Sequence, residues 1–422
     1  MCDSVVIVGE AGSVWLAKNS DREPSESQAV EHIPAAEHPD GARLRCTHVE
    51  IPQVRRTHAI TIARPTWMWG CEMGINQHAL AVANEAVFTR LPIASSGLTS
   101  MDMQRLALER CRTADDAVEQ IVELLDRFPQ GGRMSHTGSL RYHGSFLLAD
   151  PSGAWVLETA GSLWAAQRVL GRRSISNALT IEDDFDRIHP EAFAYARRRG
   201  YCRSSRDFGF ARCFSRGFYT VVGGAQARAA RTHASTEVAT LGVRELAATL
   251  RDHADDQPAS GLRMQMPCAH ASWLPTRRAG QTTASMIARL DARGSQLWMT
   301  GTSSPCLSVF KPAPIDLGRP WAERPPERAD ADSLWWRHER LHRAVLGDWV
   351  TRRSIAAEQR AALEQQSFAA TAEQVEQHLD LWDQHRRALP SWTERALAEG
   401  SARVSSFNRY WRRQSRRDGL CG

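Results

Sequence analysis

The chain has 422 residues, a formal net charge of +5, 42% apolar residues and 24% charged residues, which describes an ordinary globular protein of one large domain with an appendage, or of two domains. No window approaches about eighteen consecutive apolar residues, which excludes a membrane-spanning helix. The basic residues are spread among 48 acidic ones, without a concentrated basic stretch interleaved with aromatic residues, so we expect neither nucleic-acid nor membrane binding.

The second residue is a cysteine that follows Met1 directly. Methionine aminopeptidases remove Met1 when the next side chain is this small, and Cys2 would then carry a thiol and a free α-amine. The amine has a reference pKa of about 7.7–8.0 and the thiol of about 8.5. The amine can therefore accept the thiol's proton, as a base beside a nucleophile must. An accidental terminal cysteine is the alternative.

The residues after Cys2 predict a β-hairpin. Residues 5–8 are β-branched, residues 9–12 form a turn and residues 14–17 are apolar again. The polar cluster at residues 18–22 ends the second strand, so the hairpin folds it back toward Cys2. Only two of the 53 basic residues are lysines, and one of them, Lys18, lies in this cluster. A lysine in so arginine-rich a chain suggests that the local geometry here suits an ammonium group and not a guanidinium.

Further strands and helices alternate as far as about residue 315. We expect strands over residues 58–63, 79–83, 145–149 and 154–159, and helices over residues 99–128 with a break near Thr113, 243–253 and 282–290. A proline cluster between residues 312 and 326 marks a boundary. Beyond it the composition changes to Arg, Glu, Gln, Ala and Trp, and we expect helices to about residue 413.

Two asparagines and an arginine pair are candidates for a site. Asn84 interrupts an apolar strand, where its amide needs partners or donates to a developing oxyanion. A structural asparagine in a bulge is the alternative. Asn177 follows an apolar alternation, where a turn residue is the default reading. Arg228 and Arg231 are spaced i, i+3 at the expected start of a helix, and either could be plain surface.

A competing motif is His338-Glu339-Arg340-Leu341-His342, which matches the H-E-x-x-H pattern of zinc hydrolases. Three arginines within about one turn disfavour a dication, and no acidic third ligand stands out.

The nine cysteines are scattered, with no C-x-x-C pair, which favours reduced, mostly structural thiols in a cytoplasm. Cys268 and His270 are too close along the chain for a convincing catalytic dyad. The N-terminus lacks the basic and apolar regions of a signal peptide. We expect neither a metal ion nor an organic cofactor.

Several segments together resemble the C69 dipeptidase/secernin family. They are Met1-Cys2-Asp3 and residues 18–22, 69–88, 155–161, 176–177, 281–286, 298–302 and 334–339. That family belongs with the N-terminal nucleophile hydrolases, whose relatives include bile-salt hydrolases and penicillin V acylases. The resemblance implies an α+β fold, a four-layer αββα sandwich over residues 1–320, with a helical extension over residues 321–422.

The resemblance also implies roles for single residues. Cys2 is the nucleophile and its own α-amine the base. Asp21 holds the amine, Asn84 contributes to the oxyanion hole and Asn177 contacts the α-amine region. Arg228 matches the late active-site arginine, although the match could slip to Arg231. Lys18 favours the dipeptidase and secernin branches, because the acylases carry arginine there.

We therefore expect a cytoplasmic thiol hydrolase that cleaves a dipeptide or similar small amide through an acyl-enzyme. An N-acyl amide acylase is the second reading, and a secernin-like regulator with weak or no peptidase activity is the third. The helical tail either covers a sheet face or mediates assembly into a homo-oligomer, and the sequence does not choose between these roles.

Overall fold

The computed structural model describes residues 2–9, 12–217, 223–238, 240–253, 264–278, 280–401 and 405–420. Met1 and two positions of the predicted turn, 10 and 11, lie outside these ranges. Within them, no helix is both long enough and apolar enough to cross a bilayer.

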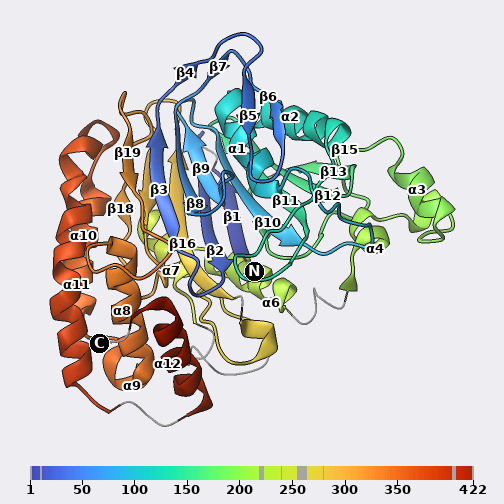
Figure 1. Cartoon of the computed structure of the whole chain (residues 1–422). Helices are drawn as coiled ribbons and strands as arrows, with labels where there is room; N and C mark the ends of the chain where they lie inside the picture. The colour runs from blue at the N-terminus through green and yellow to red at the C-terminus, as the bar shows by residue number, and fades with distance from the viewer. Residues whose placement is uncertain are drawn as a thin grey trace.

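Two antiparallel sheets dominate the fold (Figure 1). From edge to edge, the six-stranded sheet contains β14 (Arg172–Ile175), β1 (Cys2–Val8), β2 (Val14–Arg22), β16 (Gln281–Leu290), β17 (Gln296–Met299) and β18 (Lys311–Pro312). The nine-stranded sheet contains β15 (Arg187–Ile188), β13 (Leu163–Arg168), β12 (Gly153–Ala160), β11 (His143–Asp150), β10 (Ala81–Val87), β9 (Met73–Asn76), β8 (Ile60–Pro65), β3 (Gln28–Ile33) and β19 (Trp321–Glu323).

The buried side chains show that the sheets face each other between layers of helices. One core joins the sheets and includes Val6 and Leu16 from the first and Leu147 and Val156 from the second. A second core packs the nine-stranded sheet against α1 (Ser100–Arg110) and α2 (Ala114–Arg127). A third packs the six-stranded sheet against α7 (Val243–Leu250), beside α6 (Ala225–Ser235). The expected four-layer αββα architecture is confirmed.

The first hairpin has the predicted form, and its register positions the polar cluster. β1 and β2 pair antiparallel with Cys2 opposite Ser20, Asp3 opposite Asn19 and Ser4 opposite Lys18. Successive side chains of a strand point to opposite faces. Cys2, Ser4 and Lys18 therefore face the second sheet, whereas Asp3 and Asp21 face the outer helices.

One predicted helix is wrong. Residues 282–290 belong to β16, which lies between β2 and β17 in the six-stranded sheet. Ala, Met, Leu and Arg favour helix in this stretch. However, Ala284, Met286, Ala288 and Leu290 all enter the core between the sheets, while Ile287 enters the core on the opposite face. This period of two decides for a strand.

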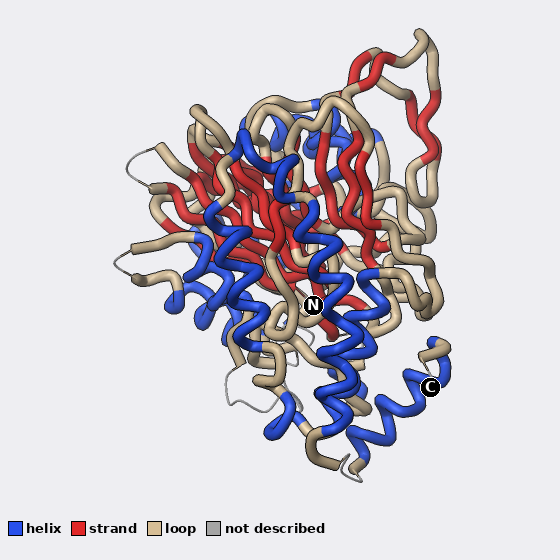
Figure 2. Tube along the Cα trace, turned by 90° about the vertical axis from the view of Figure 1, so that its left-hand side faces the viewer, coloured by secondary structure: helices blue, strands red, loops and turns tan. Residues whose placement is uncertain are grey.

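The remaining predicted helices are present with shifted ends. The break near Thr113 is confirmed, because Thr99 and Thr113 cap the starts of α1 and α2 with their side chains. The chain beyond residue 333 is mainly helical, as expected, with α8 (Leu334–Gly347), α9 (Trp349–Arg352), α10 (Ala357–Ala369), α11 (Asp380–Ala398) and α12 (Ser406–Asp418). The division at residue 320 stays a prediction. These helices stack along one side of the sheets (Figure 2).

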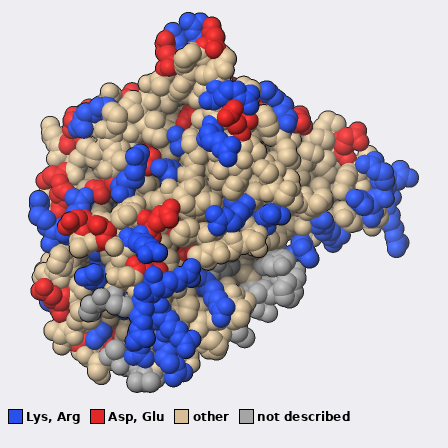
Figure 3. All heavy atoms as spheres, in the orientation of Figure 1, with Lys and Arg blue, Asp and Glu red and all other residues tan. Residues whose placement is uncertain are grey.

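Charge is less evenly spread than the sequence analysis expects. Two short helices, α3 (Ala192–Arg198) and α4 (Phe210–Phe214), extend from one end. Two small two-stranded sheets project at the top, and they pair β4 (Ala36–Glu37) with β7 (Arg56–Thr57) and β5 (Arg43–Arg45) with β6 (Glu50–Pro52). Figure 3 shows basic side chains gathered over α12 and over α3. On α12 the exposed arginines are Arg409, Arg412, Arg413, Arg416 and Arg417.

Candidate active site

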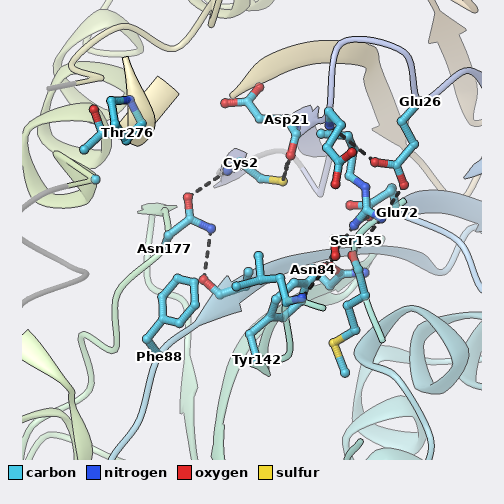
Figure 4. Close-up of a pocket in the computed structure, with 17 residues that line it drawn as sticks. Cys2, Asp21, Glu26, Glu72, Asn84, Phe88, Ser135, Tyr142, Asn177 and Thr276 are labelled. Carbon is cyan, nitrogen blue, oxygen red and sulfur yellow. Dashed lines mark hydrogen bonds and ion pairs between the residues drawn. The ribbon is translucent and has the colours of Figure 1, made fainter. Parts of the chain in front are cut away.

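Cys2 lies at the wall of a cavity of about 390 Å³ and is only 5% exposed. The backbone N–H of Asp21 donates to its sulfur at 3.3 Å, because the hairpin brings the end of β2 beside the start of β1. In Figure 4 the sulfur of Cys2 lies beside Asp21, whereas its backbone nitrogen points toward Asn177. The cavity is lined by Cys2, Asp21, Arg22, Glu23, Glu26, Glu72, Asn84, Ala86, Phe88, Met134, Ser135, Leu140, Tyr142, Asn177, Gly223, Pro275 and Thr276.

The backbone of Cys2 is fixed by the two residues that follow β14. Its nitrogen donates to Oδ1 of Asn177 at 2.8 Å, and its carbonyl oxygen accepts from the Ser176 hydroxyl at 3.0 Å. Asn177 donates in turn to the carbonyl of Ala86 at 2.9 Å. The structure therefore brings Asn177 to the nitrogen that would become the α-amine.

Arg228 lies directly behind this pair. Its Nη2 donates to Ser176 Oγ and to Asn177 Oδ1, both at 2.8 Å, and its side chain is fully buried. Its guanidinium also lies 3.4 Å from an Asp3 oxygen and 3.9 Å from an Asp21 oxygen. Arg231 instead pairs with Asp252 and is 41% exposed. Of the two arginines, Arg228 is the one in the site.

Asp21 shares the outer face of the sheet with Asp3. Its Oδ1 accepts a hydrogen bond of 2.7 Å from Thr282 on β16. Burial raises the pKa of Asp21 to about 7, and Asp3 adds to the rise while Arg228 and Thr282 oppose it. Burial also raises the pKa of Asp3. Asp21 is thus a carboxyl group whose charge changes close to neutrality.

Lys18 is fully buried on the opposite face, between the two sheets. Its Nζ donates to the carbonyl of Asn84 and lies 3.5 Å from Glu85 and 4.0 Å from Glu72. Burial favours the neutral amine, but the neighbouring acidic groups, Cys2 first and then Glu85 and Glu72, raise the pKa of Lys18. Burial raises the pKa of the Cys2 thiol to about 12, and the Lys18 ammonium opposes that rise. The thiol therefore keeps its proton in this state.

Asn84 has a side-chain amide that is already hydrogen-bonded within the protein. It lines the cavity, but its Nδ2 donates to the Cys71 carbonyl at 3.2 Å and to Gln104 at 2.8 Å. Because strand residues alternate, Glu85 faces Lys18 while the side chain of Asn84 turns toward α1. An amide in this position has both hydrogens engaged and none directed at Cys2.

Sequence reasoning missed a charged cluster on the cavity wall. Arg22 donates to Glu26 at 2.5 Å, to Glu72 at 3.0 Å and to the Tyr142 hydroxyl at 3.0 Å. The alternation of β2 holds a usable signal, since Lys18 and Arg22 must share one face. Glu72 and Tyr142 come from distant segments and carry no such signal.

The H-E-x-x-H motif, which the sequence offered as a competing zinc site, does not have the arrangement of that motif's zinc ligands. Both nitrogens of His338 are buried without a hydrogen-bond partner among the described residues, and Glu339 pairs with Arg343 at 2.9 Å. His342 faces His270, with 3.1 Å between Nε2 and Nδ1. His270 belongs to another group that could hold a metal ion, formed by His253, Cys268, His270 and Cys306.

Comparison with known proteins gives one sequence match and several structural ones. Residues 8–143, about a third of the chain, match the family described as acyl-coenzyme A:6-aminopenicillanic acid acyl-transferase. This segment contains Lys18, Asp21 and Asn84, and the other predicted site residues lie outside it.

Solved structures that resemble the chain include penicillin V acylase from Agrobacterium tumefaciens, with 14% sequence identity, 75% of this chain and 87% of that chain covered, and a TM-score of 0.42. The C2A mutant of conjugated bile acid hydrolase from Clostridium perfringens has 10% identity, 78% and 98% coverage, and a TM-score of 0.46. A Caenorhabditis elegans ortholog of N-acylethanolamine-hydrolyzing acid amidase has 10% identity, 68% and 92% coverage, and a TM-score of 0.34.

Proposed function

We propose that this protein is an N-terminal nucleophile amidohydrolase that uses Cys2 after removal of Met1. The observation that carries the proposal is the hydrogen bond from the Cys2 backbone nitrogen to Asn177, held from behind by Arg228. These hydrogen bonds give the nitrogen a fixed, buried acceptor, which would orient the α-amine once Met1 is removed. The sulfur of the same residue faces a cavity large enough for a small substrate.

The reaction begins with a proton transfer within one residue. Because the thiol pKa is about 12, a standing thiolate is scarce at neutral pH, and the α-amine accepts the proton as the sulfur attacks the carbonyl carbon. The protonated amine then gives its proton to the leaving nitrogen, which departs as an amine. Water attacks the thioester, the α-amine takes a proton from that water, and the acid leaves with the thiol restored.

Two groups stabilise negative charge on the sulfur during this step. The Asp21 backbone N–H donates to the sulfur directly, and the buried Lys18 ammonium acts on it through space. Charge on the oxyanion needs a separate donor. We assign this role to Asn84. Its amide must then give up its hydrogen bond to Gln104 and donate to the substrate oxygen at the cavity wall instead.

The cavity supports a dipeptide with a free amino group as the substrate. Four acidic side chains, Asp21, Glu23, Glu26 and Glu72, line it, and Arg22 is the one cation among the described lining residues, so an ammonium is better matched than a further carboxylate. The opposite wall, with Phe88, favours an apolar side chain. An N-acyl amide, whose acyl chain would lie against Phe88, is the second candidate. We retain a cytoplasmic location as part of the proposal.

The test compares Cys2→Ala, Cys2→Ser and the matched control Cys46→Ala, which removes a buried thiol from another core. Each variant is assayed on a panel of dipeptides and N-acyl amides, with circular dichroism to confirm folding. We expect Cys2→Ala to lose turnover and Cys46→Ala to keep it. Turnover by folded Cys2→Ala would refute the proposal.

The ratio of kcat/KM for the two substrate classes separates dipeptidase from acylase. A wild-type protein that turns over neither class, but forms a stable complex with another protein, would favour the regulatory reading instead.

A further inference from the structure

Four side chains from three separate segments form one cluster, in which the other three surround an imidazole nitrogen of His270. Nε2 of His270 lies 3.1 Å from Nε2 of His253, 3.5 Å from Sγ of Cys306 and 3.7 Å from Sγ of Cys268. All four candidate ligand atoms lie within 4.8 Å of one another. Cys268 and His270 are fully buried.

Hydrogen bonding alone cannot satisfy this arrangement well. An imidazole nitrogen carries at most one hydrogen, and here three lone-pair-bearing atoms surround it. A cation at the centre of the four atoms would satisfy all of them at once.

The spacing fits a tetrahedral zinc ion. Zinc binds nitrogen at about 2.0 Å and sulfur at about 2.3 Å, which at tetrahedral angles separates two nitrogens by about 3.3 Å and a nitrogen from a sulfur by about 3.5 Å. The three measured distances from His270 Nε2 follow this pattern. We propose that His253, Cys268, His270 and Cys306 form a structural zinc site of the Cys₂His₂ type.

The surroundings supply the outer hydrogen bonds that such a site needs. Zinc-bound histidines donate their other ring N–H to an acceptor that fixes the tautomer. His270 Nδ1 lies 3.1 Å from His342 Nε2, and His342 Nδ1 lies 3.2 Å from Glu339. The chain of donors ends at Arg343, which holds Glu339 at 2.9 Å. The last histidine of the H-E-x-x-H motif thus supports a ligand and is not itself one.

The proposed site also explains how one rim of the Cys2 cavity is held. None of the four ligands lines that cavity, but Pro275 and Thr276, from the segment of Cys268 and His270, do. Ala269 lies between the two ligands and makes two hydrogen bonds with Thr282. The Thr282 N–H donates to the Ala269 carbonyl at 3.0 Å, and the Ala269 N–H donates to the Thr282 hydroxyl oxygen at 2.9 Å. Thr282 in turn donates to Asp21. Zinc would anchor this segment to the candidate active site without joining the chemistry.

The test measures metal in the full-length protein purified without chelators, loaded with zinc chloride and desalted. Mass spectrometric metal analysis should give one zinc per chain, and X-ray absorption should show two sulfur and two nitrogen ligands at about 2.3 and 2.0 Å. Cys306→Ser should lose the zinc. His342→Ala should weaken zinc binding by about 10–100-fold, as expected of an outer-shell partner.

His338→Gln is the matched control, because it removes the other histidine of the motif and should keep one zinc. If Cys306→Ser fails to fold, the ligand set from X-ray absorption of the wild type decides alone. Wild-type protein that retains no zinc, an absorption spectrum without sulfur ligands, or a Cys268–Cys306 disulfide in freshly prepared protein would each overturn the proposal. So would zinc loss from His338→Gln with full retention in Cys306→Ser.

Discussion

Replacing Arg228 by methionine tests the buried charge arrangement behind Cys2. The side chain is fully buried, makes two hydrogen bonds of 2.8 Å and lies within 4.0 Å of both Asp3 and Asp21. Removing one partner from a buried ion pair costs about 3–5 kcal/mol. The matched control is Arg231→Met, one turn along α6, whose partly exposed pair with Asp252 is worth about 0–1 kcal/mol.

The stability that Arg228→Met loses should depend on pH in a defined direction. Asp21 already has a raised pKa of about 7 and Asp3 a raised pKa, and without the guanidinium both pKa values rise further. A carboxyl whose pKa is higher folded than unfolded stabilises below its unfolded pKa, and that stability is lost as pH rises through the folded pKa. The variant should therefore be more destabilised at pH 8 than at pH 5.

Urea unfolding at the two pH values measures this, and steady-state kinetics measure the effect on Asn177. We expect kcat to fall by about 100-fold in Arg228→Met, because the acceptor for the Cys2 nitrogen loses its support. Arg228→Lys, which retains a charge, should recover part of both losses. Equal destabilisation by the Arg228 and Arg231 variants, or no loss in Arg228→Met at pH 8, would refute the reasoning.

Three further changes test other parts of the structure. Lys18→Met should slow alkylation of Cys2 by iodoacetamide, since the thiol loses the ammonium that opposes the effect of burial, and an unchanged rate would contradict this. Asn84→Ala should lower kcat by about 10²–10³-fold if its amide serves the oxyanion, and an unchanged kcat would leave it a packing residue against Gln104. Burial lowers the pKa of Lys311 to about 7, so between about pH 7 and pH 10 the unfolded chain binds one more proton than the folded one, and wild-type stability should rise with pH. Urea unfolding of Lys311→Met across this range should lack that rise, and the same pH dependence of stability in both proteins would disprove the prediction.

The parts of the site that follow from local sequence could be predicted. The first hairpin consists of a β-branched run, a turn and a second strand, and its register determines which residues lie opposite Cys2. The position of residues 18–22 close to Cys2 therefore follows from local sequence alone. The alternation of β2 also determines that Lys18 and Asp21 lie on opposite faces of the sheet.

The parts that depend on tertiary packing could not be read in this way. Residues 282–290 carry helix-forming side chains, and only pairing with β2 and β17 makes them a strand. The choice between Arg228 and Arg231 depends on which face of α6 meets β1. The cluster around His270 combines residues from positions 253 to 306, which do not have the short spacing of a known metal-binding motif. The histidines of the H-E-x-x-H pattern do have such a spacing, but they are not members of this cluster.

The central claim is that Cys2, freed of Met1, is the nucleophile. Intact-protein mass spectrometry before and after treatment with a dipeptidyl chloromethyl ketone, followed by peptide mapping, tests it most directly. We expect a chain that lacks Met1 and gains one adduct, located on Cys2 among the nine cysteines. Fully active protein that retains Met1, or an inactivating adduct on another cysteine, would contradict it.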